Sequence, residues 1–277
     1  MAADWLTMNE APLVSVLVTC FNGLPYIRKA LDCLLNQTYS NFEIVVIDDH
    51  STDGTDIYLA ELAVNDPRVI FFHNKGKGRG KALNFGLEKC RGAYVAINDA
   101  DDYSVPERIQ KQVDFLETHP EYGLVGSMSE LVLLETGEVL NRSSHRPVTN
   151  DEIRKFFVTG QPIQHVTVLF RTALVRSLGG YNEKINFLFD RDLFLKIAKV
   201  SKVHNLEENL VLVGEHTNRY FKYQYKGIER DWMSTKYQIK AILAFGFSPF
   251  KILPVLAKFM YSVLLNIKHF FTRYEKN

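Results

Sequence analysis

The amino-acid sequence predicts an α/β protein with a Rossmann-like, mostly parallel sheet and helices on both faces. Apolar, β-rich runs alternate with segments whose apolar residues recur at helical spacing, which is the pattern of repeated βαβ units. Polar clusters follow these runs where strands would end, and open α/β sheets bind ligands there. With 46% hydrophobic and 23% charged residues, the 277-residue chain can build a sizeable core, and intrinsic disorder is excluded.

The first half of the chain carries the parallel part of the predicted sheet. Residues 13–20 (LVSVLVTC) are apolar almost throughout, which predicts a strand buried on both faces. Ile27, Leu31 and Leu34 then fall at helical spacing, and the same alternation repeats along the chain. The expected strands are residues 13–20, 43–48, 68–73 and 94–98, and the expected helices are residues 25–37, 54–64 and 81–89.

Beyond Gly123 the pattern changes. Residues 123–135 and 137–140 are predicted to form antiparallel strands joined at a Glu-Thr-Gly turn, and residues 165–171 another strand. Residues 190–200 have the spacing of a helix. The last fifty residues predict two further helices, so we expect a main domain over residues 1–225 and C-terminal amphipathic helices over residues 226–277.

The second of these C-terminal helices, expected over residues 250–273, is apolar around most of its circumference. Its polar residues form one narrow stripe, made of Lys258, Ser262, Asn266, His269 and Arg273. The longest uncharged stretch is too short to span a bilayer, which needs roughly 20 apolar residues. Because the tail is also cationic, it suits a helix lying on an anionic membrane surface, with packing on the domain or on a second subunit as the alternative.

The overall charge and the cysteines argue against several classes of protein, namely nucleic-acid-binding, disulfide-rich and zinc-binding proteins. Lys and Arg number 33 against 32 Asp and Glu, so the net charge of +1 does not suggest nucleic-acid binding. The three cysteines have no CxxC spacing, which argues against a disulfide framework or a zinc site. The first twelve residues contain no basic residue, so we expect no signal peptide and a cytoplasmic protein.

The sharpest local signal is residues 98–102 (NDADD), which follow the expected fourth strand. The carboxylates of Asp99, Asp101 and Asp102 repel one another unless a cation or hydrogen bonds compensate. Hard oxygen ligands suit Mg²⁺ or Mn²⁺. We therefore expect a divalent metal site, with an acidic turn that caps the helix beginning near Pro106 as the alternative.

Two other polar segments follow expected strands. The pair Asp48-Asp49 closes the second strand, and a carboxylate there can accept a hydrogen bond from a ring N–H of a nucleobase. Residues 75–81 (KGKGRGK) alternate cations with glycines, and such a loop can wrap a diphosphate. The loop matches neither the P-loop pattern nor GxGxxG, so a mobile, solvated loop is the alternative.

Two carboxylates open the helix expected over residues 190–200. The helix dipole alone would favour Asp190 and Asp192 at this end. The functional alternative is a general base held at the helix end and facing the ligand cleft.

Taken together, these segments resemble the family 2 glycosyltransferases. The match is strong over residues 13–107 and looser to about residue 216. The matching segments, in chain order, are residues 14–22 (VSVLVTCFN), 35–39 (LNQTY), 43–54 (EIVVIDDHSTDG), 80–84 (GKALN), 92–94 (GAY) and 98–102 with its DxD element.

The resemblance implies the GT-A fold, with residues 1–225 as the domain that binds nucleotide sugar and acceptor. It implies that Asp190 is the catalytic base, that Asp101 is a ligand of Mn²⁺ or Mg²⁺, and that His216 is a second candidate metal ligand. The residues that it assigns to donor nucleotide binding are Thr19, Phe21, Asn22, Asp49, Lys81 and Asp99.

The expected activity is metal-dependent, inverting transfer of one sugar from a UDP-sugar donor to a hydroxyl of a glycan acceptor. We expect a hexosyl- or N-acetylhexosaminyltransferase of surface polysaccharide biosynthesis, with a lipid-linked acceptor and peripheral contact at the inner face of the cytoplasmic membrane. The sequence has no QxxRW segment, which argues against a processive synthase. A non-catalytic nucleotide-sugar or polysaccharide-binding protein is the main alternative. A sugar nucleotidyltransferase would carry a glycine-rich loop directly after the first strand, where this chain has residues 19–22 (TCFN).

Overall fold

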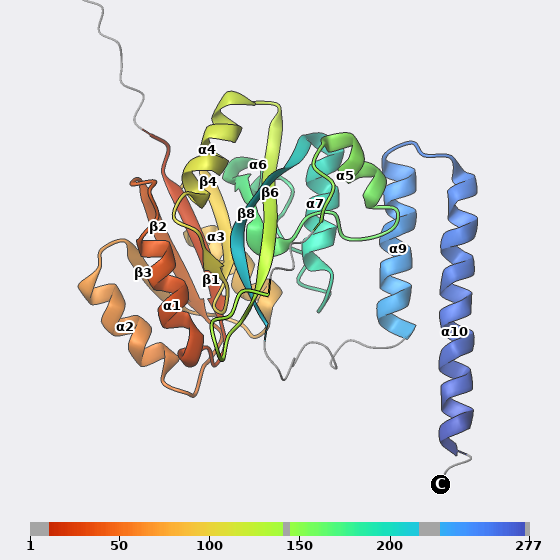
Figure 1. Ribbon diagram of the computed structural model, residues 1–277, viewed down its shortest axis with the longest axis horizontal. Coiled ribbons are helices and arrows are strands. Elements are labelled where there is room, and N and C mark those ends of the chain that lie inside the picture. The colour runs from red at the N-terminus through yellow and green to blue at the C-terminus, as the bar shows by residue number, and fades with distance from the viewer. Residues whose placement is uncertain (1–10, 141–144, 216–227, 275–277) are drawn as a thin grey trace, which may run out of the picture.

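The computed structural model describes residues 11–140, 145–215 and 228–274, and these form an eight-stranded mixed sheet between two layers of helices (Figure 1). The strand order is β3-β2-β1-β4-β7-β6-β8-β5. The strands are β1 (Val14–Cys20), β2 (Phe42–Asp48), β3 (Val69–His73), β4 (Tyr94–Asp99), β5 (Tyr103–Ser104), β6 (Tyr122–Leu133), β7 (Leu169–Arg171) and β8 (Lys202–Glu215).

The helices lie between the strands along the chain and at its C-terminal end. The α-helices are α1 (Leu24–Leu35), α2 (Thr55–Asn65), α3 (Arg79–Lys89), α4 (Arg108–Thr118), α5 (Asn150–Phe156), α6 (Thr172–Ser177), α7 (Phe189–Val200), α9 (Ile228–Ala244) and α10 (Ile252–Tyr274). Short 3₁₀ helices cover His165–Thr167 and Pro249–Lys251.

The apolar run of β1 is continuous because both of its faces are buried. Val16 and Val18 belong to a core that is closed by α1, α2 and α4. Leu17 points to the other face and joins a second core, to which α3, α6, α7 and α9 contribute. The predicted α/β architecture with helices on both faces of the sheet is therefore confirmed.

The parallel strands set the position of the functional edge. β1 pairs in parallel with β2 on one side and with β4 on the other, so the direction in which strands are added reverses at β1. In such sheets the crevice beyond the carboxyl ends of the strands at this point is the ligand-binding position. The four strands and three helices expected over residues 13–98 are all present, with ends shifted by at most two residues.

The antiparallel hairpin expected over residues 123–140 is wrong in its second strand. The Glu-Thr-Gly turn exists, with Gly137 at φ 74°, but among the described residues that follow it, up to residue 140, the pairing is a single bridge between Val132 and Val139. β6 instead pairs in parallel with β8 along nearly its whole length. The pairing contains register shifts near Met128, and such bulges break the regular alternation by which β8 could have been recognised.

The strand expected over residues 165–171 is half correct. Only Leu169–Arg171 form β7, which pairs antiparallel with β4 and β6. His165–Thr167 form a 3₁₀ turn in which the Thr167 N–H donates to the Gln164 carbonyl. His165, Val166 and Thr167 are all buried, as consecutive residues of an internal strand would be, although two of them are polar.

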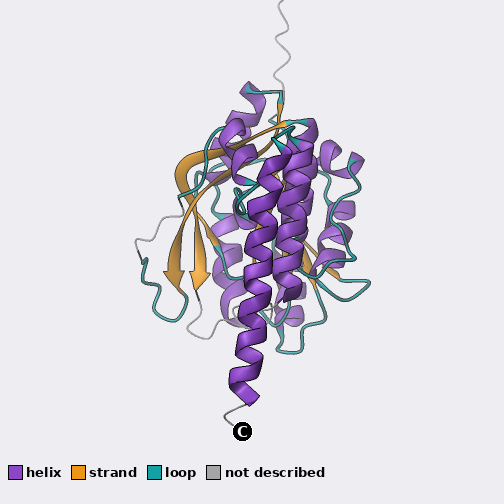
Figure 2. Cartoon of the chain, turned by 90° about the vertical axis from the view of Figure 1, so that its right-hand side faces the viewer, coloured by secondary structure: helices purple, strands orange, loops and turns teal. Residues whose placement is uncertain are grey.

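The two C-terminal helices run side by side in opposite directions, and α10 projects beyond the rest of the protein (Figures 1 and 2). α9 is part of the main core, because Tyr237, Ala241 and Ile242 are buried against α7 and its neighbours. The predicted boundary at residues 225 and 226 falls within residues 216–227, which lie outside the described residues.

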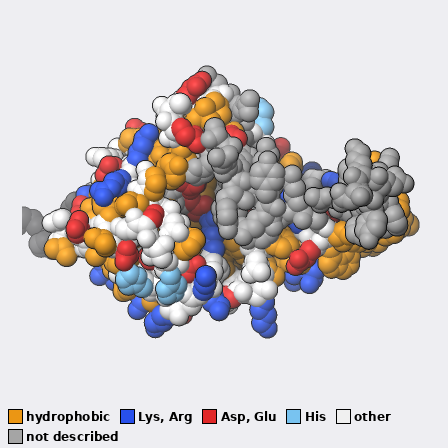
Figure 3. Space-filling view, turned by 90° about the horizontal axis from the view of Figure 1, so that it is seen from below, with side chains coloured by type: hydrophobic (Ala, Val, Ile, Leu, Met, Phe, Trp, Pro, Cys, Tyr) orange, Lys and Arg blue, Asp and Glu red, His pale blue; other side chains and the backbone are white. Residues whose placement is uncertain are grey.

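The described part of α10 turns its predicted polar stripe partly inward. The Ser262 hydroxyl donates to the Asp231 carboxylate of α9, and Phe259 packs on Trp232. An exposed apolar face remains on the other side, visible as the hydrophobic end of the molecule in Figure 3. We call it the α10 face, and its residues are Phe250, Leu253, Leu256, Met260, Tyr261, Leu264 and Leu265. No helix within the described residues is both long enough and apolar enough to cross a membrane.

Candidate active site

A pocket of about 860 Å³ opens beyond the carboxyl ends of β1, β2 and β4. Its volume lies within the range of roughly 300–1,000 Å³ that is usual for small-molecule sites. Figure 3 shows acidic and basic side chains gathered in a hollow on this side of the molecule. The charged and polar side chains that line the pocket are Thr19, Asn22, Tyr26, Asp49, Arg79, Asp99, Asp101, Asp102, Arg146, Gln161, Gln164, His165 and Asp190.

The loops after β1 and β2 are hydrogen-bonded to each other at one end of the pocket. Asn22 accepts a hydrogen bond from the Thr52 N–H (2.8 Å), and its own N–H donates to the Ser51 hydroxyl (2.8 Å). Asp53 accepts from the Leu24 N–H at the start of α1 (3.1 Å). Thr19, Phe21 and Asn22 are thereby held at the pocket wall, and the Phe21 side chain is 59% exposed.

Asp49 lies in the pocket wall and fixes the start of the cation-rich loop. Its carboxylate accepts from the Asn74 side-chain amide (2.7 Å) and from the Gly78 N–H (2.9 Å). Gly78 has φ 105°, a conformation that favours glycine, so the loop can bring its N–H to the carboxylate. Residues 75–81 are thus folded against Asp49 as α3 begins.

Lys81 does not line the pocket, whereas Arg79 does. The Lys81 side chain is exposed and runs beside Gly76. Arg79 is the first residue of α3, and residues two apart on a helix point in different directions, so the two side chains cannot both face the pocket. The predicted role of Lys81 in donor binding stays a prediction, and Arg79 is the cation of this loop that reaches the site.

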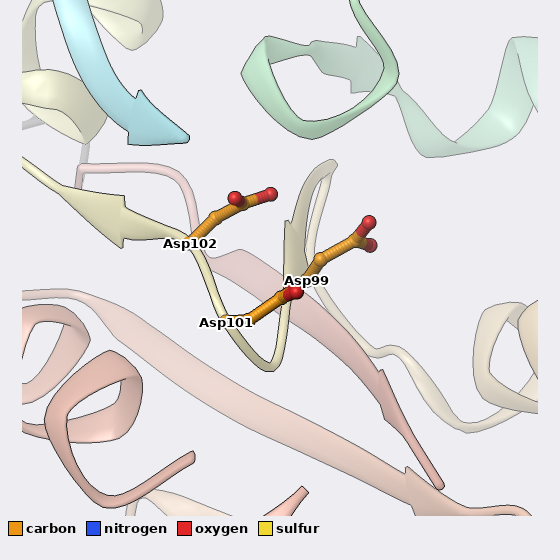
Figure 4. Close-up of side chains that lie close together, drawn as sticks. All are labelled: Asp99, Asp101 and Asp102. Atoms are coloured by element: carbon orange, nitrogen blue, oxygen red, sulfur yellow. The ribbon is translucent and has the colours of Figure 1, made fainter. Parts of the chain in front are cut away.

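Three carboxylates meet on the turn between β4 and β5 (Figure 4). One oxygen each of Asp99, Asp101 and Asp102 lies within 4.8 Å of the other two. Oxygen donors at this spacing fit a hard divalent cation such as Mn²⁺ or Mg²⁺. The alternative, a capping role for the turn, is wrong: the N-cap of α4 is Glu107, and the side-chain oxygen that accepts from its first turn belongs to Gln37 (Ile109 N–H, 3.0 Å).

The Asp102 carboxylate is buried beside the other two, and it accepts a hydrogen bond from the Gly214 N–H (2.9 Å). Burial, together with the charges of Asp99 and Asp101, raises the pKa of Asp102 well above its ordinary value. A Cβ at Gly214 would come within 2.4 Å of the Asp101 carbonyl, so glycine lets β8 approach the turn. A bound cation would relieve the part of this shift that comes from the neighbouring charges, and the fit to a metal rests on the spacing of the three carboxylates.

A buried arginine, Arg108, stabilises the acidic turn through a network of hydrogen bonds. The Asn98 side-chain amide donates to the carbonyls of Asp99 (2.7 Å) and Asp102 (3.0 Å). The oxygen of the same amide accepts from Arg108 (3.1 Å), which also donates to the Ser104 hydroxyl (2.8 Å). Burial lowers the pKa of Arg108 to about 9, so it remains a cation at neutral pH. The turn therefore rests on a satisfied polar network, which restricts its movement.

The structure separates the two carboxylates at the start of α7. Asp190 lines the pocket, where it accepts from the Gln161 side-chain amide (3.0 Å). Asp192 points away from the pocket: it accepts from the Tyr237 hydroxyl of α9 (3.0 Å) and pairs with Lys196 (2.8 Å). Of the two candidates for a general base, only Asp190 can meet a ligand bound in the pocket.

The pocket and the acidic turn lie within the region that a family model recognises. The model described as Glycosyl transferase family 2 matches residues 15–174, more than half of the chain. The chain belongs to this glycosyltransferase family. The predicted resemblance is thereby confirmed, and with it the GT-A type of sheet.

Curated relatives of this glycosyltransferase include bacterial proteins of similar length. It is 32% identical over 218 residues to the putative glycosyltransferase EpsE of Bacillus subtilis, covering 77% of each chain. It is 34% identical over 205 residues to the amylovoran biosynthesis glycosyltransferase AmsE of Erwinia amylovora, covering 73% of this chain and 76% of that protein. Chondroitin synthase of Escherichia coli is 30% identical over 215 residues, but this chain spans only 31% of that protein.

Solved structures agree on the fold. A crystal structure of S. aureus TarS in complex with UDP-GlcNAc superposes with a TM-score of 0.69 at 22% identity, covering 89% of this chain and 71% of that one. The mannosyltransferase PcManGT from Pyrobaculum calidifontis, in complex with GDP-Man and Mn²⁺, gives a TM-score of 0.60 at 22% identity, covering 91% and 70%. At this level of identity the similarity establishes the fold of the glycosyltransferase and nothing finer.

The glycosyltransferase also has a buried cluster around Arg79 that the sequence did not reveal. Arg79 pairs with Asp99 and donates to Nδ1 of His165 (3.4 Å), while Nε2 of His165 bonds to the Tyr181 hydroxyl (2.8 Å). Burial and the neighbouring Arg79 lower the pKa of His165 to about 4, so the ring is neutral at physiological pH. Because arginine can only donate, Nδ1 is the acceptor and the His165 proton is assigned to Nε2. His165 therefore holds Arg79 against the acidic turn.

Several residues of the site had no signal of their own in the sequence. His165 begins the segment expected as a strand, and Arg146, Gln161 and Gln164 come from stretches without any recognised pattern. The run of residues 75–81 was the signal that could have found Arg79. His216, the second candidate metal ligand, lies outside the described residues.

Proposed function

We propose that this glycosyltransferase moves a single sugar from a UDP-sugar donor to a hydroxyl of a glycan acceptor, with inversion, in surface polysaccharide biosynthesis. The observation that carries the proposal is that one pocket contains both the acidic turn at the end of β4 and the Asp190 carboxylate at the start of α7. The names of EpsE and AmsE support the glycosyltransferase and polysaccharide parts. Proteins of this fold bind UDP-GlcNAc (TarS) and GDP-Man (PcManGT), so the choice of UDP rests on the family resemblance.

On the donor side, the nucleotide would occupy the end of the pocket formed by the loops after β1 and β2. The exposed ring of Phe21 is available to stack on a base, and Asp49 offers carboxylate oxygens to a ring N–H. The diphosphate would then lie near the acidic turn, with Arg79 as a fixed cation beside it. Thr19, Asn22 and Asp99 complete this proposed donor site.

The proposed metal is Mn²⁺ or Mg²⁺, with Asp101 and Asp99 as the protein ligands. A bound divalent cation would act as a Lewis acid on the diphosphate leaving group, a contribution of several kcal/mol. All three carboxylates of the turn line the pocket, but Asp102 is buried and already accepts the Gly214 N–H. The Mn²⁺ in the PcManGT complex supports the presence of a metal in a protein of this fold.

The chemistry assigned to this chain's residues is a single displacement. The Asp190 carboxylate would take the proton of the acceptor hydroxyl as that oxygen attacks the anomeric carbon from the side opposite the diphosphate. The bond to the diphosphate breaks as the new glycosidic bond forms, so the configuration at this carbon inverts. Gln161 and the Arg191 N–H hold the carboxylate in place through hydrogen bonds of 3.0 and 2.8 Å.

Calorimetric titration with UDP, GDP and dTDP, each with Mn²⁺, with Mg²⁺ and with EDTA, tests this proposal first. We expect UDP to bind when either metal is present and to lose most of its affinity in EDTA. The corresponding UDP-sugars should then be hydrolysed slowly or transferred, and the anomeric coupling constant of the product, measured by NMR, reports whether the configuration inverts. If no nucleotide binds, the proposal is replaced by the non-catalytic alternative.

We also propose that α10 lies on the inner face of the cytoplasmic membrane and brings the enzyme to a lipid-linked acceptor. The α10 face exposes large apolar side chains along one side of the helix, with Lys251 and Lys258 also exposed. The basic residues of the tail, five against one Glu from Phe245 onward, suit an anionic surface. An anionic lipid surface would explain both the exposed apolar side chains of the α10 face and the positive charge of the tail. A second copy of this chain would explain the apolar side chains but not the positive charge.

Co-sedimentation with vesicles tests the membrane proposal. The double variant Met260→Glu, Leu264→Glu should lose binding to vesicles that contain anionic lipid, because it places charge within the α10 face. Val64, which is 86% exposed on α2, provides the matched control Val64→Glu, and this variant should bind like the wild-type chain. Dimerisation of the wild-type chain without any vesicle binding would instead assign the α10 face to a second subunit.

A further inference from the structure

A second arginine of the pocket lies near the Asp190 carboxylate. Nη1 of Arg146 donates to the Gln161 carbonyl (2.6 Å), and the Gln161 side-chain amide donates to Asp190 (3.0 Å). All three residues line the pocket. A chain of two hydrogen bonds therefore fixes the Arg146 guanidinium near the group proposed to take the acceptor's proton.

The charge of Arg146 is less compensated than that of the other arginine in the pocket. Arg79 is paired with the Asp99 carboxylate, whereas Arg146 makes no ion pair within the part of the chain that the structure describes. The Nε atoms of both arginines are buried without a hydrogen-bond partner, so the difference between them is the ion pair. Burial lowers the pKa of Arg146, and only the charge of Asp190 opposes this shift. A cation held in this way gains from an anion that binds beside it.

The chemistry of the guanidinium defines the class of anion. Its planar fork can donate two parallel hydrogen bonds, which matches a carboxylate or a phosphate. The donor diphosphate is proposed to lie near Asp99 and Asp101, whereas Arg146 donates to Gln161 and lies near Asp190. An anion at Arg146 would instead lie on the side of Asp190, where the acceptor hydroxyl must be held.

We propose that Arg146 binds an anionic group of the acceptor, so that the acceptor of this enzyme is an acidic or phosphorylated sugar. The inference rests on the proposed function, because it takes Asp190 as the general base and the acidic turn as the donor side. Pairing the anion with Arg146 neutralises a poorly solvated cation and orients the attacked hydroxyl toward Asp190. Carboxylate and phosphate share this chemistry, and the experiment separates them.

Calorimetry with three small glycosides, on protein with and without UDP and Mn²⁺, tests the proposal. The probes are methyl β-D-glucoside, methyl β-D-glucuronide and methyl β-D-glucoside 6-phosphate. At least one charged probe should bind about 10- to 100-fold more tightly than the neutral glucoside, the gain expected of charge-assisted hydrogen bonds. A preference for the glucuronide identifies a uronic-acid acceptor, and a preference for the phosphate identifies a sugar-phosphate acceptor.

Substitutions then decide whether Arg146 causes the preference. Arg146→Met should bring both charged probes to the affinity of the neutral one, and Arg146→Lys should keep part of the gain. The control Arg28→Met, at an exposed position on α1, should change nothing. UDP affinity should stay within twofold in all three variants, because neither Arg146 nor Arg28 is among the residues proposed to bind the donor.

Two results would overturn the proposal. Equal binding of the three probes by the wild-type chain would mean that the pocket does not select charge. The second result is an Arg146→Met variant that still prefers the charged probes but turns over every acceptor more slowly by the same factor. This result would mean that Arg146 only positions Gln161 and Asp190. If instead the proposed function is wrong, the wild-type chain will not bind UDP. The preference for charged probes can still be measured in that case, because it is also tested on protein without nucleotide.

Discussion

Asp190→Asn is expected to lower the kcat of sugar transfer by about 10²- to 10⁴-fold, the usual contribution of a general base. The amide has the shape of the carboxylate and can still bond to Gln161, but it cannot take a proton from the acceptor hydroxyl. UDP affinity, measured by calorimetry with Mn²⁺, should remain within twofold, because Asp190 is not one of the three carboxylates that meet at the acidic turn. Steady-state kinetics on saturating donor and acceptor measure the effect.

Asp192→Asn is the matched control, since it makes the same chemical change two residues away on the same helix. Asp192 pairs with Lys196 and accepts from Tyr237, outside the pocket. This variant should therefore lose about 1–3 kcal/mol of unfolding free energy, measured in urea, and keep its kcat. The reverse pattern, full activity in Asp190→Asn and a large loss of kcat in Asp192→Asn, would remove Asp190 from the mechanism.

Asp101→Asn is expected to lower kcat/KM by about 100-fold or more and to raise the Mn²⁺ concentration needed for half-maximal activity. The metal's contribution is several kcal/mol, and each 1.4 kcal/mol corresponds to a factor of ten. The substitution removes one negative charge from the turn and leaves a poorer oxygen ligand of the same size. Donor turnover measured over a Mn²⁺ titration gives both quantities in one experiment.

The same removal of charge at an exposed position provides the control for Asp101. Asp32 lies on the exposed side of α1, and Asp32→Asn should leave the Mn²⁺ dependence of the wild-type chain unchanged. An Asp101→Asn variant with the wild-type Mn²⁺ dependence would show that Asp101 is not a metal ligand. The remaining candidates among the described residues would then be Asp99 and Asp102.

The parallel half of the fold could be predicted from the sequence because its signals are local. Each strand from β1 to β4 is a short apolar run buried on both faces, and each is followed by a helix with its own apolar spacing. The acidic turn could be found for the same reason, since Asp99, Asp101 and Asp102 are neighbours in the chain. Their meeting within 4.8 Å needs only one turn of backbone.

The second half depends on contacts between distant segments, which short-range patterns do not encode. The pairing of β6 with β8 joins residues about eighty positions apart, and bulges interrupt its alternation. His165–Thr167 are buried like a strand but form a 3₁₀ turn, because this turn leads the chain from the pocket into β7. The sequence pattern correctly indicated that both segments are buried. It did not indicate which strands pair with each other.

By itself the sequence determined the α/β class, the edge of the sheet that carries the site and the acidic turn, since all three follow from residues adjacent in the chain. Only the tertiary structure decided between Asp190 and Asp192, and between Arg79 and Lys81. Each pair lies two residues apart on a helix, so its members point in directions about 200° apart. Which direction meets the pocket depends on how α3 and α7 pack on the sheet, through cores built from the whole chain.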